Sequence, residues 1–389
     1  MNREGGGWLA LAAVSLAVFV AALDLTVTTA VLPQLIFDFQ IPLPEGLAHA
    51  AWIVNGYLIA YVVTMPLMGR VSDLYGRRLT FLVCLSLFVA GSLWAGGADR
   101  LGPMVTRVVE PLWPGKLEPW AGPLLSMVAA RVVQALGGGA MVPVALAAVS
   151  DAVSVRHRPL ALGIVAALDT AGWVAGPVYG AWLATSLGWR WIFWLNVPIG
   201  LVAALPVWLA LRDHPRTRHQ LDVVGAALLT LFLLAFTLAL YRAAPAGAET
   251  GALATSSAPT VSPWLWAFLA SSLLALVGFI LRQRRAREPL IDPLLLRGRT
   301  FAAANLVSLL TGVVLMGVMV EIPVLLAALS GSLQEGTAAS GWLLALFAGG
   351  MVVGALAAGL LLRGLAARLV ALGGLVAMIA GLWQMAVWE

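Results

Sequence analysis

Four ionisable side chains lie deep inside long apolar stretches of the sequence: Asp24, Arg131, Asp169 and Glu321. Placing each of these residues at the centre of a membrane-spanning helix costs about 2.5–3.5 kcal/mol even on the most lenient scale of membrane insertion. Their presence therefore indicates a functional role. A carboxylate in such surroundings binds a proton or releases it as charged partners leave or approach. The sequence therefore offers these positions as candidates for reversible proton binding inside a membrane.

Asp24 and Arg131 are predicted to lie at one depth. Asp24 stands nine residues before Pro33, and Arg131 ten residues after Ala121, which places both roughly 14–15 Å from the same membrane surface. The two side chains can then neutralise each other, and a protein that separates them in one conformation would load Asp24 with a proton. A static ion pair that holds two helices together is the alternative, and it stays open.

Asp169 precedes a pattern of small residues, G-x-x-x-G-P-x-x-G, formed by Gly172, Gly176, Pro177 and Gly180. Small residues at helical spacing permit close backbone approach, and the proline removes a hydrogen bond and bends the helix. A generic packing face is the plain alternative. Asp169 itself either binds a proton or a cationic ligand, or has neither role.

Glu321 lies seven residues before the end of its apolar stretch at position 328. An acid at this place is a port for protons or a contact for a cation. A carboxylate that reaches the water beyond the helix end is the alternative interpretation, and the sequence does not separate the two.

The segment 69–78 is a dense charge cluster between two apolar stretches, with the pattern G-x-x-x-D-x-x-G-R-R at Gly69, Asp73, Gly76, Arg77 and Arg78. Glycines allow a tight reversal between helices, and ion pairs that exist in one conformation only bias a two-state equilibrium. This favours a gating role for the 69–78 loop. A purely topological role of the arginines is the alternative.

Composition identifies an integral membrane protein, since 61% of the residues are hydrophobic, 11% are charged and the mean hydropathy is +0.95. Stretches of about twenty apolar residues indicate helices, because a barrel would show alternating segments of about ten. We therefore expect an all-α protein with eleven spans, at roughly 8–33, 50–69, 79–97, 121–150, 160–186, 190–211, 222–242, 263–282, 301–328, 338–362 and 366–388.

The charge distribution predicts the orientation. With a cytoplasmic amino terminus, seventeen of the 23 lysines and arginines lie inside and five outside, and Arg131 lies in the membrane. Cytoplasmic loops carry such an excess. We therefore expect a multi-pass protein of the cell (inner) membrane whose basic loops face anionic lipid, and we assign it no nucleic-acid partner.

Three parts are expected along the chain: a six-helix bundle at 1–211, two linker helices with a basic loop at 212–299, and a partial second bundle at 300–389. The outer stretch 98–122 is longer than a simple connection. Its neighbourhood holds Pro103, Pro111, Pro114, Pro119 and Pro123, which argue against a helix. A tolerated loop insertion and a specialised outer cap both remain open.

The 69–78 pattern resembles the signature loop of the major facilitator superfamily, whose members are two six-helix bundles around a central cavity. The whole chain is similar to its fourteen-span drug:proton antiporter family (EmrB/QacA type), and it apparently lacks the last three spans. The resemblance rests on the following segments: 23–27 and 30–33, 131–140, 172–181, 189–200, 221–226 and 288–292.

This resemblance implies a proton-coupled antiporter that exports amphipathic or cationic drug-like compounds by alternating access. It assigns proton or substrate coupling to the four buried ionisable residues, gating to the 69–78 loop and the antiporter motif to the Gly172–Gly180 pattern. A dedicated metabolite exporter and a truncated, non-transporting membrane protein are the alternatives. We expect no enzyme activity, metal or cofactor beyond the proton gradient; the partners are small molecules, protons and the lipid bilayer, and any adaptor is unknown.

Overall fold

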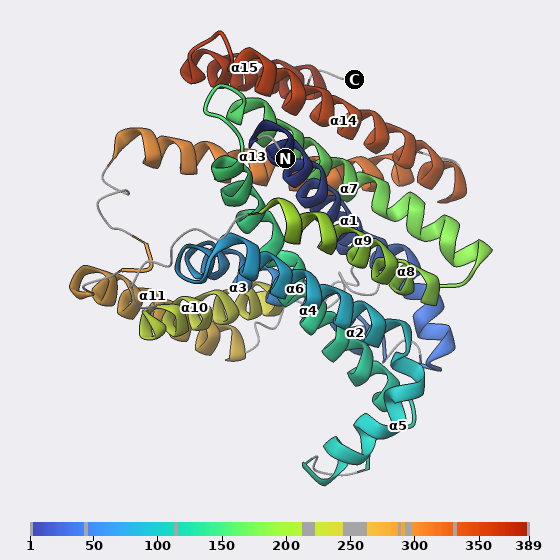
Figure 1. Ribbon diagram of the computed structural model, residues 1–389. Helices are drawn as coiled ribbons and strands as arrows, with labels where there is room; N and C mark the ends of the chain where they lie inside the picture. The colour runs from blue at the N-terminus through green and yellow to red at the C-terminus, as the bar shows by residue number, and fades with distance from the viewer. Residues whose placement is uncertain are drawn as a thin grey trace.

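The computed structural model describes residues 3–42, 46–112, 116–211, 222–243, 263–286, 289–291, 298–329 and 333–386. Within these ranges the regular structure consists of α-helices and one short 3-10 helix, without any strand (Figure 1). The prediction of an all-α fold is confirmed.

The amino-terminal half is a helical bundle with α1 (Arg3–Asp38) and α6 (Ala121–Ala152) at its centre. Both helices are mostly buried, and they contact each other and most of their neighbours. The surrounding helices are α2 (Leu47–Ala50), α3 (Trp52–Tyr75), α4 (Arg77–Gly96), α7 (Arg158–Ser186), α8 (Arg190–Trp194) and α9 (Asn196–Ala210).

Glycines on α6 let this helix pack tightly between α3 and α4. A Cβ atom added to Gly139 would lie 2.6 Å from the carbonyl oxygen of Tyr61 on α3. One added to Gly137 would lie 3.0 Å from the Cα of Phe88 on α4. Backbones therefore meet directly on both sides of α6, as small residues allow in membrane bundles.

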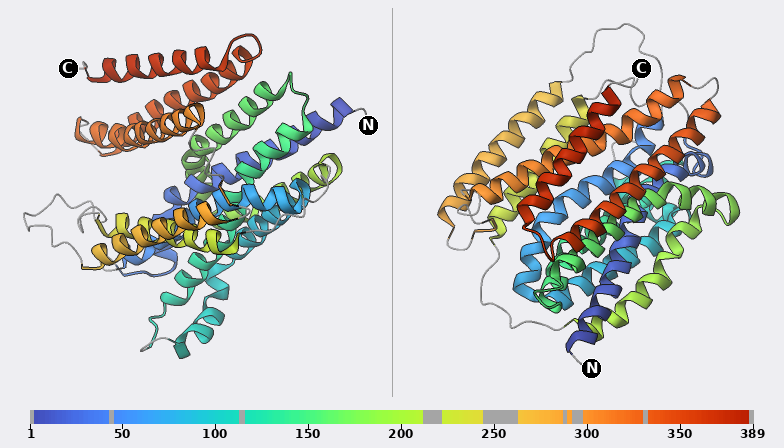
Figure 2. Two further views of the ribbon diagram at one scale, coloured as in Figure 1. Left: turned by 90° about the vertical axis from the view of Figure 1, so that its left-hand side faces the viewer. Right: turned by 90° about the horizontal axis from the view of Figure 1, so that it is seen from above.

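Beyond residue 211 the described ranges contain five further helices. α10 (Val223–Ala243) and α11 (Pro263–Arg285) lie side by side, and α10 contacts α3, whereas α14 (Leu333–Leu361) packs on α7 (Figures 1 and 2). At that contact a Cβ on Gly359 would lie 3.1 Å from the carbonyl oxygen of Pro159. The remaining helices are α13 (Arg299–Leu329) and α15 (Ala367–Ala386).

Nine described helices are long and apolar enough to cross a membrane, and they coincide with the first eight predicted spans and the last one. The predicted spans 301–328 and 338–362 fall on α13 and α14, whose described apolar parts are shorter, at Arg299–Leu315 and Gly349–Leu361. The chain is therefore a multi-pass helical membrane protein.

The expectation that the stretch 98–122 contains no helix was wrong. Ala98–Val109 forms α5, and Glu110–Leu112 continue it as a 3-10 turn. Pro103 is tolerated inside α5, while the next proline, Pro111, lies only in the terminal turn. Tertiary contacts hold the helix: Gly102 packs against Pro123 of α6, and Asp99 accepts a hydrogen bond from Arg190 at 2.6 Å. Figure 1 shows α5 projecting from one end of the bundle.

Candidate functional site

A fully buried ion pair joins α1 and α6 in the middle of the bundle. Arg131 Nη1 donates to Asp24 Oδ2 at 2.5 Å, and Arg131 Nη2 donates to the backbone carbonyl oxygen of Asp24 at 3.3 Å. Both side chains are 1% exposed. The equal depth expected for these residues is thus matched by a direct contact.

Two amide side chains complete the hydrogen bonding of Asp24, and a serine hydroxyl supports them. Gln134 Nε2 and Asn196 Nδ2 each donate to Asp24 Oδ1 at 2.9 Å. The same two amides also donate to the hydroxyl of Ser92, at 2.7 and 3.3 Å. Both carboxylate oxygens therefore have donors, contributed by α6 and α9 and supported by α4. We call these five residues, Asp24, Ser92, Arg131, Gln134 and Asn196, the polar network.

Aromatic rings cover the guanidinium of Arg131. Its Cζ lies 3.8 Å from the ring centroid of Tyr57 on α3 and 5.7 Å from that of Phe193 on α8. A desolvated cation above such rings gains roughly 2 kcal/mol from their quadrupoles. Arg131 Nε and the Tyr57 hydroxyl have no hydrogen-bond partner among the described residues. The charge is thus enclosed by rings as well as by its carboxylate.

The local sequence explains where Asn196 sits. The span Arg190–Ala210 is divided into α8 and α9, which meet at Leu195. Asn196 is the first residue of α9, and its side chain is 2% exposed. The helix break therefore brings an amide donor to the carboxylate from a span that contains no charge at this depth.

The polar network has a defined chemical capacity. Asp24 accepts hydrogen bonds from three side-chain donors, Arg131, Gln134 and Asn196, and one of these donors is a cation. Separating Arg131 from Asp24 would leave two buried charges without a partner, which costs several kcal/mol. In the structure the network is closed, with Arg131, Gln134 and Asn196 all donating to the Asp24 carboxylate.

The Gly172–Gly180 pattern packs against α1 beside this network. A Cβ on Gly172 would lie 3.0 Å from the backbone nitrogen of Leu23, and one on Gly176 would lie 2.7 Å from the Leu23 carbonyl oxygen. Thr26 Oγ1 also donates to the carbonyl oxygen of Trp173 at 2.8 Å. The segment of α1 that carries Asp24 is thus held by direct backbone contact with α7.

The other predicted residues of α7 differ in position. Gly180 is buried, whereas Pro177 is exposed. Asp169 is partly buried, and its Oδ1 atom is buried without a hydrogen-bond partner among the described residues. Glu321 lies within helix α13, and its side chain is outside the described part of the structure. The structure therefore brings together Asp24 and Arg131 but does not link Asp169 to them by a hydrogen bond.

The 69–78 loop forms the junction of α3 and α4. Gly76 has φ +98° and ψ 144°, a conformation that side chains disfavour, and α4 begins at the next residue. Around Gly69, by contrast, there is open space, with no atom within 4 Å of an added Cβ. Of the two predicted glycines, only Gly76 is required by its backbone conformation.

Charged groups of the 69–78 loop join the ends of four helices. Arg77 forms an ion pair with Asp73, and its Nε donates to Asp151 Oδ2 on α6 at 3.2 Å. Arg78 lies over the ring of Trp208 on α9, 5.2 Å from its centroid. These contacts remain within one bundle and fix the ends of α3, α4, α6 and α9 against one another.

Several contributors were missed by reasoning from the sequence alone. Neutral amides at Gln134 and Asn196 are rare in apolar spans, and this rarity is the signal by which they could have been found. Ser92 and Tyr57 give no such signal, because their participation depends on how the helices are rotated. Asp151 was missed because it lies at a span end, where a carboxylate is ordinary.

A multi-pass helical membrane protein with a charged network sealed inside one bundle has the form of a transporter. The chain belongs to the Major Facilitator Superfamily, whose family model matches residues 14–389. It is similar in fold to the xylose transporter XylE from E. coli in a partially occluded inward-open conformation, with a TM-score of 0.50, 13% identity and coverage of 95% of this chain and 88% of that one.

Relatives at higher identity include proteins named as triacylglyceride transporters. The chain is 32% identical to one of Mycolicibacterium hassiacum over 391 residues, covering 99% of this chain and 66% of the relative. It is 31% identical to one of Mycobacterium tuberculosis, covering 99% and 68%, and 32% identical to one of Mycobacteroides abscessus, covering 98% and 67%. The chain thus spans about two thirds of the length of these relatives.

Proposed function

We propose that this protein is a proton-coupled transporter that moves a triacylglyceride-class lipid across the cell membrane by alternating access. The observation that carries the proposal is the polar network, in which a buried carboxylate and guanidinium neutralise each other inside an otherwise apolar bundle. The relatives' names supply the substrate class. They favour a dedicated metabolite transporter over an exporter of drug-like compounds.

The proposed cycle uses the polar network as its switch. In the closed state Asp24 is held by Arg131, Gln134 and Asn196. A change in the packing of α1 against α7 moves Asp24 away from Arg131, and the freed carboxylate takes up a proton. Return of Arg131 expels that proton, so each cycle exchanges a proton for a step of substrate movement. Asp169 and Glu321 are proposed as additional sites on the proton's route.

The assignment of parts follows the same proposal. Residues 1–211 form the bundle that holds the switch, residues 212–299 contribute two linker helices, and residues 300–389 begin the second bundle. The proposed orientation places the amino terminus in the cytoplasm, which is supported by the excess of lysine and arginine in the loops that would then be cytoplasmic.

Vesicles that contain the purified protein test the transport proposal. A pH gradient across the vesicle membrane should drive radiolabelled trioleoylglycerol from one leaflet to the other, and an uncoupler that dissipates the gradient should stop the movement. Equal rates with and without the gradient would contradict proton coupling. If the gradient moved cationic dyes but not trioleoylglycerol, the substrate would be a drug-like compound and not a triacylglyceride.

Asp73→Ala is expected to slow transport by up to about fivefold while changing the unfolding free energy by less than about 1 kcal/mol. Asp73 is half exposed and pairs with Arg77, so its loss shifts a conformational equilibrium more than it harms the fold. Arg363→Ala is the matched control, because Arg363 is exposed and its loop, 359–368, has no carboxylate. Initial transport rates would be compared, and equal defects would contradict a gating role of Asp73.

A further inference from the structure

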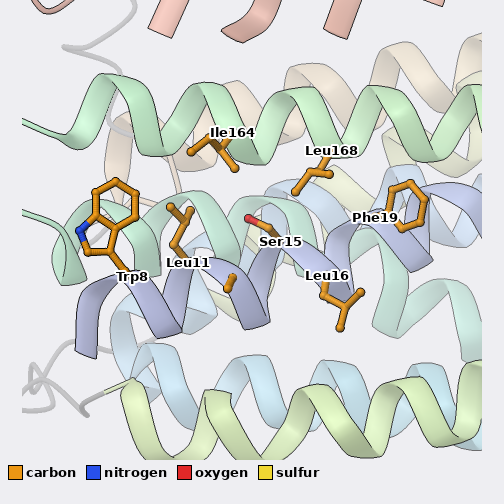
Figure 3. Close-up of a pocket in the computed structure, with 8 residues that line it drawn as sticks. Trp8, Leu11, Ser15, Leu16, Phe19, Ile164 and Leu168 are labelled. Atoms are coloured by element: carbon orange, nitrogen blue, oxygen red, sulfur yellow. The ribbon is translucent and has the colours of Figure 1, made fainter. Parts of the chain in front are cut away.

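An apolar crevice runs between α1 and α7 at the amino-terminal end of α1, away from the polar network. Its volume is about 460 Å³, within the usual range of roughly 300–1,000 Å³ for small-molecule sites. It is open at the surface, since Trp8 is 41% and Leu16 is 39% exposed. Figure 3 shows its lining, which includes Trp8, Leu11, Ser15, Phe19, Ile164 and Leu168.

Ser15 is the exception in this apolar lining. Its side chain is 1% exposed, and its hydroxyl has no hydrogen-bond partner among the described residues. Serine and threonine hydroxyls in helices usually bond to the carbonyl four residues back, as Ser92 does to Phe88 at 2.8 Å and Thr64 to Ala60 at 2.6 Å. A buried donor without a partner costs free energy, so an acceptor supplied by a ligand would be stabilised here.

The depth of Ser15 indicates which ligand can supply that acceptor. Trp8 lies at the start of the apolar span Gly7–Thr28 and its ring lies 6.0 Å from that of His157, so it marks the membrane interface. Ser15 is seven residues further along α1, about 10 Å deeper. The ester carbonyls of a phospholipid are kept at the interface by its polar headgroup. A neutral acylglycerol has no such headgroup, and its esters can reach the depth of Ser15.

We propose that this crevice is a binding site for a neutral acylglycerol, with an acyl chain between Leu11, Phe19 and Leu168 and an ester carbonyl accepting a hydrogen bond from Ser15. The site deepens the proposed function and rests on it. The crevice and the polar network share α1 and α7, and Asp24 is nine residues from Ser15 on the same helix. A lipid that moves α1 and α7 apart would loosen the contact between these helices that holds Asp24 in place.

Photolabelling of the full chain in phospholipid vesicles tests the site. The probe is trioleoylglycerol with a diazirine on one acyl chain, and labelled peptides are identified by mass spectrometry. We expect labels in residues 8–19 and 164–168. Ser15→Ala should lower this labelling about fivefold, which corresponds to about 1 kcal/mol. Its thermal unfolding temperature should not fall, because the substitution removes a buried hydroxyl that has no partner within the described protein.

Two further variants sharpen the result. Ala12→Trp should abolish labelling by filling the crevice, since Ala12 lines it. Ser86→Ala should leave labelling unchanged, since Ser86 is on α4 and its hydroxyl bonds to the carbonyl of Leu82. Equal labelling of wild type and Ser15→Ala would overturn the proposal, and so would equal labelling by a phosphatidylcholine with the same diazirine.

The outcome is separable from that of the transport experiment. If labelling depends on Ser15 but the pH gradient does not move trioleoylglycerol, the transport proposal is wrong and the lipid-site proposal stands. If the pH gradient moves trioleoylglycerol but labelling does not depend on Ser15, the lipid-site proposal is wrong and the transport proposal stands.

Discussion

Arg131→Ala is expected to lower the free energy of unfolding by about 3–5 kcal/mol and to abolish transport, because it leaves the carboxylate of Asp24 buried without a countercharge. The pair is 1% exposed on both sides, so water cannot replace the lost guanidinium. Chemical denaturation in detergent measures the first effect, and lipid movement in vesicles measures the second.

Two comparisons make this expectation specific. Arg190→Ala is the control, since Arg190 pairs with Asp38 and Asp99 near the surface, where such pairs contribute about 0–1 kcal/mol. The double variant Asp24→Asn with Arg131→Gln leaves no unpaired charge and should regain much of the stability while remaining inactive. A single Arg131→Ala variant that is as stable as the wild type would show that the pair is not sealed from water.

Gly176→Val has the second large expected effect. We expect the free energy of unfolding to fall by about 1–3 kcal/mol or more, and transport to be lost. A Cβ at this position would meet Thr26 Oγ1 and would lie 2.7 Å from the carbonyl oxygen of Leu23. The valine must therefore push α7 away from the part of α1 that carries Asp24.

The matched control is Gly349→Val on α14. Gly349 is helical and exposed, and a Cβ there meets no atom within 4 Å. Thermal unfolding of both variants, followed by transport measurements at a temperature where each is folded, separates loss of fold from loss of coupling. If Gly176→Val were no worse than Gly349→Val in both assays, the close contact of α1 and α7 would not be required.

The sequence alone predicted the helical membrane fold and the contact of Asp24 with Arg131, because apolar length identifies spans and residue counting gives depth. It did not predict the amides of Gln134 and Asn196 around Asp24, since counting gives depth but not helix rotation. Contacts between the ends of spans could not be predicted from the sequence either. Asp151 joins Arg77 only because α6 ends beside the start of α4, which is a tertiary fact.

The stretch 98–122 shows a different limit. Proline content argued against a helix, yet α5 forms because contacts with α6 and Arg190 outweigh the lost hydrogen bond at Pro103. Local propensity was overruled by packing. The coupling roles given to Asp24, Arg131, Asp169 and Glu321 stay predictions, and so do the gating role of the 69–78 loop and the antiporter role of the Gly172–Gly180 pattern.

The most direct test of the account is a count of protons released when trioleoylglycerol is moved in reconstituted vesicles, for the wild type and for Asp24→Asn. Asparagine keeps the size of the side chain but cannot carry the proton, and Asp38→Asn on the same helix serves as the control. The account predicts proton release by the wild type and the control and none by Asp24→Asn. Undiminished release by Asp24→Asn would remove Asp24 from the mechanism.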